Sequence, residues 1–263
     1  MRPSPARCPS PAETVRTLVA GRLPGLAYLA HRSGPFHVRH VTDAEGRVLL
    51  LVPVHSDLAA VLPRDPGTDV AVALDVLDLP PAAGAPSLGR AWVSGWAVAL
   101  HGDAARRAAL DFAEVEPTGD LLDVGTRFRL HRFEVAEARL ERPEGMLRID
   151  PLAYAEAEPD PLHPVEGELL TEFAGHHGRE MTAYVRRQLG LAECARTDPP
   201  RVVRVDRYGL VVSFGGPGTR RRARLAFPAP LAGPGELARL LHPVLCRHPE
   251  SRHPESRHRA GPA

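Results

Sequence analysis

Histidine, arginine and tryptophan are the residues of this sequence whose types and spacing could bind a ligand. His37 and Arg39 alternate within FHVRH, so a β-strand would place these two on one face and His40 on the other. Because the two imidazoles would point in opposite directions, we expect no metal ion shared between them. Two hypotheses remain for His37 and Arg39: solvated strand residues, or members of a cleft at a dimer interface.

The only two tryptophans lie in GRAWVSGWAVAL, residues 89–100. Strand alternation places Trp92, Ser94 and Trp96 on one face and small residues on the other. One hypothesis puts both tryptophans in the core of a barrel, because large aromatic side chains dominate core burial. The alternative makes them a stacking wall for a flat ring. The small residues of the opposite face would let another backbone, a helix or a flat ligand come close.

Further basic side chains lie at regular spacing. Arg129 and His131 share one face of a strand expected over 126–140, where a guanidinium could hold a carboxylate with paired donors; strand-edge arginines are the alternative. His177 falls in an apolar stripe of a helix expected over 164–189, which predicts a buried histidine that is hydrogen-bonded to a neighbouring sheet. The run Arg220–Arg222 has no aromatic neighbours and is expected to be a solvated strand face.

Composition excludes several classes of protein. The chain has no lysine, so neither a Schiff-base lysine nor a P-loop lysine is available. Its 33 basic and 32 acidic residues nearly cancel, which argues against binding to nucleic acid or a membrane surface. Three widely spaced cysteines, Cys8, Cys194 and Cys246, match neither a disulfide framework nor a zinc site. With no apolar run near membrane-spanning length, we expect a cytoplasmic protein.

His37 and Arg39 lie in the segment 36–53. It reads as two strands joined by a turn at Asp43–Gly46, where Gly46 can adopt a positive φ angle. The unbroken aliphatic run from Val48 to Val52 is typical of a strand that is buried on both sides. A hairpin with such an arm needs more sheet around it.

The surrounding sequence supplies that sheet. Further strands are expected over 25–32, 69–79, 89–100 and 126–140, with helices beginning at the caps Ser10, Ser56 and Asp103. About six antiparallel strands with short helices suit a small closed barrel. The predicted fold class is therefore α+β.

The second half of the chain has a different composition. Residues 151–163 are rich in proline, alanine and acidic residues and are expected to form a linker after a barrel domain spanning 11–150. A domain of one long helix, three strands and a closing helix is expected over 164–246. Residues 1–10 and the repeat RHPESRHPESRH within 247–263 are expected to be disordered, because the repeat has prolines and no apolar residue.

Several segments carry a resemblance to a known family. They are WVSGW at 92–96, GDLLDVGT at 119–126, HRFEVAEARL at 131–140 and DPLHPVEGELLTEFAGHHGREM at 160–181. The first half resembles a six-stranded split barrel of the pyridoxamine-phosphate-oxidase type, which is the FMN-binding-type barrel. The second half resembles the domain of unknown function DUF2470, and the pair is similar to the HugZ-like haem-binding and haem-degrading proteins.

This resemblance implies a homodimer that binds haem or a related tetrapyrrole. A neutral imidazole is a competent axial ligand, and arginines can hold the propionates. The residues that would bind the cofactor are His37, Arg39, Trp92, Trp96, Arg129, His131, His177, His248 and His253.

Two alternatives to haem binding remain, and the first rests on a departure from the family pattern. HugZ-like enzymes follow the last barrel strand with a Gly-Gly-Phe-Gly loop, but this chain has Arg142-Pro143-Glu144-Gly145. That difference favours a non-catalytic regulatory dimer that docks on a partner protein. A flavin (FMN) or deazaflavin (F420) oxidoreductase is the third hypothesis, with Ser56 and Arg64 as the nearest phosphate donors to the strand at 69–79.

Overall fold

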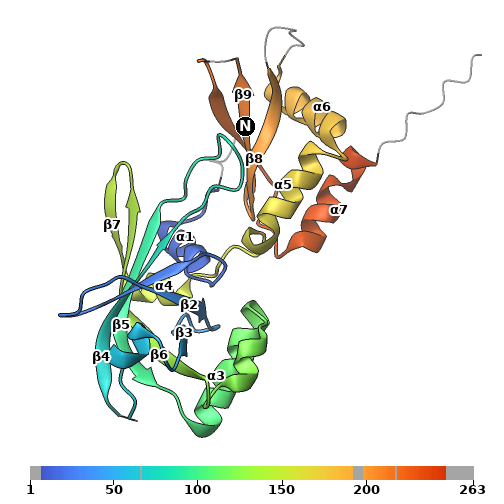
Figure 1. Ribbon diagram of the computed structural model, residues 1–263. Helices are drawn as coiled ribbons and strands as arrows, with labels where there is room; N and C mark the ends of the chain where they lie inside the picture. The colour runs from blue at the N-terminus through green and yellow to red at the C-terminus, as the bar shows by residue number, and fades with distance from the viewer. Residues whose placement is uncertain (1–6, 66, 192–197, 217, 247–263) are drawn as a thin grey trace, which may run out of the picture.

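The computed structural model describes residues 7–65, 67–191, 198–216 and 218–246. Two antiparallel sheets make up the molecule, a large one from the first half of the chain and a three-stranded one from the second. The smaller sheet and its helices lie beyond one end of the large sheet, which gives the protein an elongated outline (Figure 1).

The large sheet closes into a six-stranded barrel, as the sequence predicted. All its pairings are antiparallel, in the order β3-β2-β1-β4-β5-β6, and a further pairing of β3 with β6 closes the ring. A seventh strand, which was not predicted, pairs with the far half of β6. The strands are β1 (Gly25–Leu29), β2 (Phe36–Thr42), β3 (Val48–Pro53), β4 (Asp69–Leu77), β5 (Arg90–Ala99), β6 (Phe128–Arg142) and β7 (Gly145–Ile149).

The hairpin of β2 and β3 has the turn and the burial that the sequence predicted. Gly46 takes a φ of 81° in the turn. On β3, Leu50 and its alternate neighbours fill the barrel, whereas Leu49 and Leu51 pack outside it against α3 (Gly102–Val115). Both faces of β3 are therefore covered.

Short helices pack against the barrel. α1 (Pro11–Leu18) starts with the predicted capping box, in which the Glu13 amide donates to Ser10 Oγ at 3.1 Å and the Ser10 amide donates to Glu13 Oε2 at 2.7 Å. Its apolar side, including the fully buried Val15 and Leu18, joins the barrel core. α4 (Pro151–Glu156) packs beside α1, and α2 (Asp57–Val61) is capped by Ser56 as predicted. The 3-10 turn η1 (Gly119–Asp123) follows α3.

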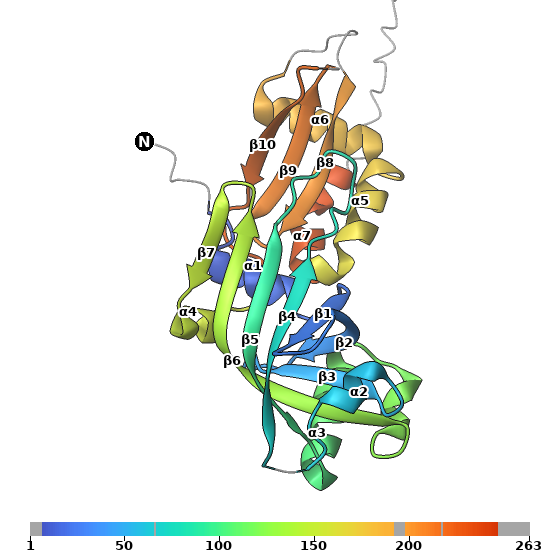
Figure 2. The same ribbon diagram turned by 60° about the vertical axis from the view of Figure 1, so that its left-hand side comes forward.

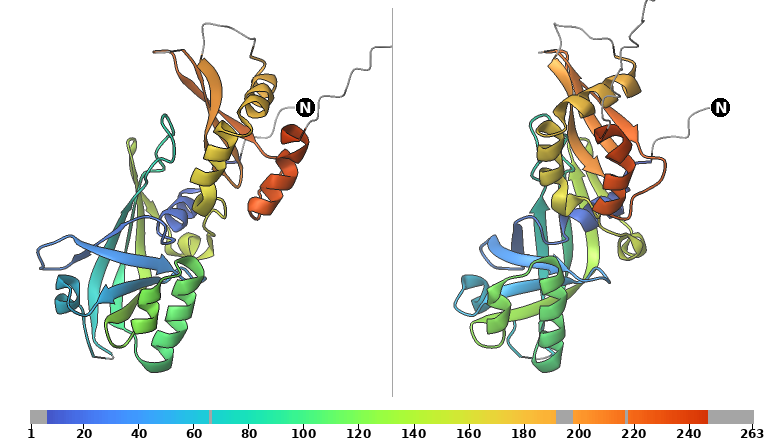
Figure 3. Two further views of the ribbon diagram at one scale, coloured as in Figure 1. Left: turned by 45° about the vertical axis from the view of Figure 1, so that its right-hand side comes forward. Right: turned by 90° about the vertical axis from the view of Figure 1, so that its right-hand side faces the viewer.

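The small sheet has the order β10-β9-β8, and three helices cover one of its faces (Figure 3). Leu237 and Leu241 of the closing helix are buried in its core, as expected. The elements are η2 (His163–Val165), α5 (Glu166–Ala174), α6 (Gly178–Leu189), β8 (Asp198–Asp206), β9 (Gly209–Gly215), β10 (Arg221–Ala226) and α7 (Pro234–Leu245).

A buried ion network holds the two sheets together. Arg204 of β8 bonds to Asp78 of the loop after β4, donates to Glu166 Oε2 at 3.1 Å, and donates to the Pro86 carbonyl at 2.7 Å. Burial raises the pKa of Glu166 to about 7, which Arg204 and the Val205 amide partly oppose. The long loop between β4 and β5 thereby ties the barrel to the small sheet.

Two helix predictions need correction. The helix expected over 164–189 breaks at Gly175 and continues as α6 from Gly178. Two glycines within four residues favour such a break, because glycine is a poor helix former. Asp103 lies in the first turn of α3, but His101 holds the N-cap position without a side-chain hydrogen bond. The segments 1–6 and 247–263 and Cys194 lie outside the described residues.

Candidate functional site

The outer side of β1, β2, β4 and β5 carries aromatic, small and charged side chains. In the part of the chain that the structure describes, no helix lies over β4 and β5 on this side (Figure 2). We call this outer side the tryptophan face. Trp96 is 59% exposed and Leu77 is 53% exposed, although each lies on a strand that is paired on both sides. Its members are Leu26, Tyr28, His37, Ala71, Ala73, Asp75, Leu77, Trp92, Ser94 and Trp96.

This arrangement corrects the prediction that the tryptophans fill the core. The barrel interior takes the opposite, small-residue side of β5, where Ala91, Val93 and Ala97 are buried. A bulge after Ser94 brings β6 so close that a Cβ on Gly95 would lie 2.0 Å from the Glu134 carbonyl oxygen. Glycine is therefore required at this bulge, and large side chains are left for the outside.

The register places three of the predicted site residues on this one face. His37 pairs with Leu26, Leu26 with Asp75, and Asp75 with Trp92, so these four form a row across the strands. Three strand spacings of about 4.8 Å separate His37 from Trp92 by about 14 Å. Trp96 lies two rows further along β5, opposite Ala71.

An ion pair fixes the middle of this face. Arg90 Nε donates to Asp75 Oδ1 at 2.6 Å, and a second bond makes the pair bidentate. The Asp75 side chain is 1% exposed. Arg90 also lies over the Trp92 ring at 4.9 Å from its centroid, and Tyr28 contacts the same ring at 5.5 Å between centroids. The indole of Trp92 is thus held in place, whereas Trp96 is free to contact a ligand.

A cleft of about 730 Å³ lies along β2 and shares His37 with the tryptophan face. We call it the β2 groove. Arg22 and His37 line it on the exposed side, and Leu23, Leu51 and Phe128 supply apolar wall. Among the described residues, Arg22 has no hydrogen-bond or ion-pair partner. A negatively charged group in the groove would meet an available guanidinium there.

Arg39 also lines the β2 groove, but its charge is already neutralised. Its guanidinium donates to Glu116 Oε1 at 2.9 and 3.1 Å and to Asp120 Oδ2 at 2.6 Å. Glu116 directly follows α3 and Asp120 lies in η1. Arg39 therefore links β2 to α3 and η1. Arg22 is better placed to hold an anion, and sequence patterns did not indicate it because it precedes the first strand.

His40 lies on the inner face of β2, opposite His37 and Arg39, as strand alternation predicted. Its side chain points into the barrel beside Gly25, and the residue is 2% exposed. Neither ring nitrogen makes a hydrogen bond of ordinary geometry within the described residues. Burial lowers the pKa of His40 to about 4, an effect that the Val38 backbone opposes. The imidazole is therefore neutral at pH 7. It is buried because His40 occupies an inward-facing position of β2.

Arg129 and His131 share the inner face of β6, away from the tryptophan face. His131 is 1% exposed, and its Nε2 lies 3.0 Å from the Pro63 carbonyl oxygen. Burial lowers the pKa of His131, and the bond to Pro63 opposes that effect. Arg129 pairs with Val52 and is half-buried at the mouth of the barrel. This histidine has a structural bond inside the barrel, whereas Trp96 lies on its outer side.

His177 does not lie in an apolar helical stripe. It occupies the N-cap position of α6, at the helix break, and its Nε2 lies 3.6 Å from Glu172 Oε1. The prediction of a buried histidine bonded to a sheet was wrong because the helix does not run through this position. His248 and His253 lie outside the described residues.

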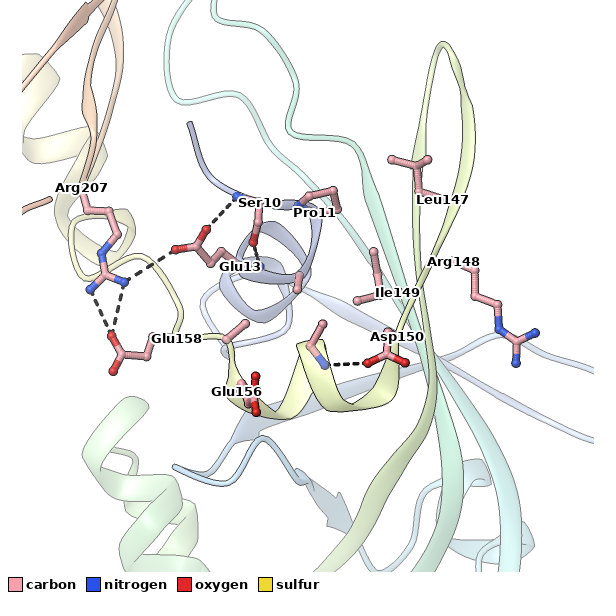
Figure 4. A pocket seen from close by; sticks show the side chains of 13 residues that line it. Ser10, Pro11, Glu13, Leu147, Arg148, Ile149, Asp150, Glu156, Glu158 and Arg207 are labelled. Atoms are coloured by element: carbon pink, nitrogen blue, oxygen red, sulfur yellow. Dashed lines mark hydrogen bonds and ion pairs between the residues drawn. The ribbon is translucent and has the colours of Figure 1, made fainter. Parts of the chain in front are cut away.

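A separate pocket of about 600 Å³ between α1, β7 and α4 is rich in carboxylates (Figure 4). Two of these carboxylates already have partners across the two sheets: Arg207 donates to Glu158 Oε2 at 3.2 Å, and Tyr208 donates to Glu13. Arg148 points away from the other labelled side chains (Figure 4). This pocket therefore belongs to the contact between the two sheets.

Two further properties concern the described part of the chain. None of its helices is long and apolar enough to cross a membrane. Within the same residues, no three or more histidine, cysteine or carboxylate side chains are grouped so that they could hold a metal ion.

No protein-family model and no curated protein sequence matches this chain. Among solved structures, a haem binding protein from Mycobacterium smegmatis superimposes with a TM-score of 0.62 at 21% identity, covering 91% of this chain and 97% of that one. At this identity the likeness concerns the fold, and it spans both sheets.

Two more distant structures share part of the chain. The FAD and haem binding protein from Mycobacterium smegmatis has a TM-score of 0.32 at 13% identity, covering 54% of this chain and 83% of its own. The flavocytochrome Anf3 from Azotobacter vinelandii has a TM-score of 0.32 at 16% identity, covering 56% of this chain and 73% of its own. Neither is similar enough in fold to support an argument.

Proposed function

We propose that this protein binds haem or a related tetrapyrrole on the tryptophan face, and that it belongs with the HugZ-like split-barrel proteins. The observation that carries this function is a face of exposed Trp96, ordered Trp92 and His37 on a fold shared over nearly its whole length with a haem binding protein. An aromatic surface of this kind stacks on a flat ring at little cost in side-chain entropy.

The residues present fit such a ring. The indoles would cover one face of it, and His37, in the same row as Trp92, would supply an imidazole to the iron. Arg22 would hold a propionate, because Arg39 is already bonded to two carboxylates. When bound, haem would supply the redox chemistry of its iron, and the protein would position it and exclude water.

A single chain can contact only one side of a flat ligand on the tryptophan face, because this face is exposed to solvent. We therefore propose that a second copy of the chain covers this face in a homodimer. Patches of exposed apolar side chains on a barrel are typical of association surfaces. Sedimentation velocity should find a dimer, and a monomer at micromolar concentration would contradict this part of the proposal.

Haem titration of the purified protein tests the binding function. We expect a Soret shift that saturates at one haem per chain, together with quenching of tryptophan fluorescence. The His37→Ala variant should change the Soret position, because it would remove the imidazole that would bind the iron. His242→Ala, which removes an exposed histidine on α7, is the matched control and should behave like wild type. An unchanged spectrum at micromolar haem would contradict haem binding.

A specific observation favours a second function, that of a non-catalytic regulator that docks on a partner protein. The residues Pro143 and Glu144 form the tight turn of the β6–β7 hairpin, where Arg142 pairs with Gly145. Arg142 itself donates to the Leu88 carbonyl at 3.2 Å. This turn offers no flexible loop to lie against a cofactor. Ascorbate added to the haem-bound protein tests whether the protein is catalytic: loss of the Soret band with product formation would contradict a non-catalytic regulator, and a stable band is the result expected for one.

A further inference from the structure

The break between α5 and α6 opens a second pocket, separate from the tryptophan face. It has a volume of about 590 Å³ and lies between the two helices and the start of β8. Its inner wall is apolar and consists of the buried side chains Leu170, Phe173, Met181 and Val185. A cavity of this size, closed at its base by aliphatic and aromatic groups, suits a small apolar ligand. We call it the helix-break pocket.

Two irregularities of the backbone meet across this pocket. On one side, the helix stops at Gly175 and restarts at Gly178. On the other, β8 shifts register against β9 twice, between Asp198 and Arg201 and between Val202 and Arg204. Prolines occupy two positions of the first shift. Bulges and helix breaks cost stability and are common beside functional sites.

The charged residues that line this pocket within the described ranges are all of one sign. Arg179 and Arg201 line it and are exposed, and none of the described lining residues is a carboxylate. Neither guanidinium forms an ion pair or hydrogen bond with another residue in the described ranges. The β2 groove, by contrast, contains Glu116 and Asp120. An apolar interior with these two arginines at the entrance is complementary to a ligand that has an apolar body and an anionic head.

We propose that the helix-break pocket binds an amphiphilic carboxylate, with its hydrocarbon body against Phe173 and Met181 and its carboxylate between Arg179 and Arg201. Guanidinium groups bind carboxylates with paired, charge-assisted hydrogen bonds. The apolar wall contributes affinity in proportion to the buried hydrocarbon area. This site is independent of the proposed haem site.

Isothermal titration calorimetry with sodium dodecanoate below its micelle concentration tests this site. We expect saturable binding of one dodecanoate per chain, and much weaker binding of dodecyltrimethylammonium, which has the same tail and a cationic head. Arg179→Glu and Arg201→Glu should each weaken dodecanoate binding at least about tenfold, since each removes a charge-assisted contact. The exposed Arg221 does not line the pocket, so Arg221→Glu is the charge-matched control and should bind like wild type.

A filling variant tests the location. Thr182 lines the pocket from α6, and Thr182→Trp should abolish dodecanoate binding, whereas Thr182→Ser should retain it. Circular dichroism verifies that the filled variant is folded, and if it is not, the two arginine variants decide. Equal binding of the anionic and cationic amphiphiles, or unchanged binding in both arginine variants, would overturn the site. Trp96→Ala should bind dodecanoate normally, so that failure of haem binding and failure of this site give different results.

Discussion

Two flanks of the same barrel differ in what covers them. Around β3, the outward residues Leu49 and Leu51 lie under α3 and form a second apolar cluster with Phe112 and Leu130. Around β4 and β5, no helix of the described residues lies over the outer side (Figure 2), and the outward side chains of Trp96 and Leu77 are exposed. The interior is filled in both cases. The difference shows that barrel closure does not depend on the tryptophans, which leaves the bare flank free to bind a ligand or a second copy.

The covered flank should show the largest effect on stability. Phe112 is fully buried between α3 and the barrel, so Phe112→Ala should lower the free energy of unfolding by about 3 to 5 kcal/mol. Chemical denaturation measures this change. Leu110→Ala, on the exposed side of the same helix, should cost less than about 1 kcal/mol. If the two variants lost equal stability, α3 would not be an integral layer of the barrel.

The barrel interior should be sensitive to acid through His40. Its pKa is about 4 in the folded state, compared with about 6.5 in an unfolded chain, so the unfolded state binds more protons as the pH falls between these values. The stability contributed by the neutral imidazole is complete above pH 6.5 and is lost toward pH 4. The loss amounts to about 3 kcal/mol.

The His40→Leu variant isolates this contribution. Glu166, whose pKa is raised to about 7, changes stability in the opposite direction between its unfolded and folded pKa values, so the total curve alone is ambiguous. Urea denaturation of both proteins from pH 7.5 to pH 4 gives the difference. We expect the free energy of unfolding of the wild type to fall relative to that of His40→Leu as the pH falls. A constant difference between the two free energies would show that His40 is not held neutral by burial.

On the bare flank, the Asp75–Arg90 pair should have an intermediate effect. Asp75→Ala leaves a guanidinium that can turn partly to solvent, so the expected loss is about 1 to 3 kcal/mol. Asp103→Ala, which disrupts an exposed pair at 3.7 Å, should cost no more than about 0.5 kcal/mol. Thermal denaturation of the two variants compares them. Equal melting temperatures would mean that the buried pair does not order this face.

A small effect on stability is expected for Trp96. Because its side chain is mostly exposed, Trp96→Ala should change the free energy of unfolding of the free monomer by less than about 1 kcal/mol. Chemical denaturation at low protein concentration measures it. A loss near that of Phe112→Ala would show that the bare flank is packed like the covered one.

Local patterns predicted much of the fold. The capping box at Ser10, the turn at Gly46 and the doubly buried β3 follow from short-range rules, and closure into a six-stranded barrel followed from the number and order of strands. The strand β7 escaped prediction because Pro143 and Gly145 read as a loop and the strand after them is only five residues long.

The site was harder to predict for a physical reason. Alternation separates the two faces of β5 but does not say which one faces inward, and here the space left by neighbouring strands admits only alanine, valine and glycine. The helix break at Gly175 depends on tertiary packing that periodicity does not contain. Cross-strand register, not sequence spacing, brings His37 and Trp92 into one row.

Haem titration of a Trp92→Ala, Trp96→Ala double variant tests the central claim most directly. Leu122→Ala, which removes a side chain that is 91% exposed elsewhere on the barrel, is the control. We expect the Soret titration of the double variant to show at least about tenfold weaker binding, since base-sized aromatic stacking contributes about 1 to 3 kcal/mol per ring system. Haem binding of wild-type strength in the double variant would contradict a site on the tryptophan face.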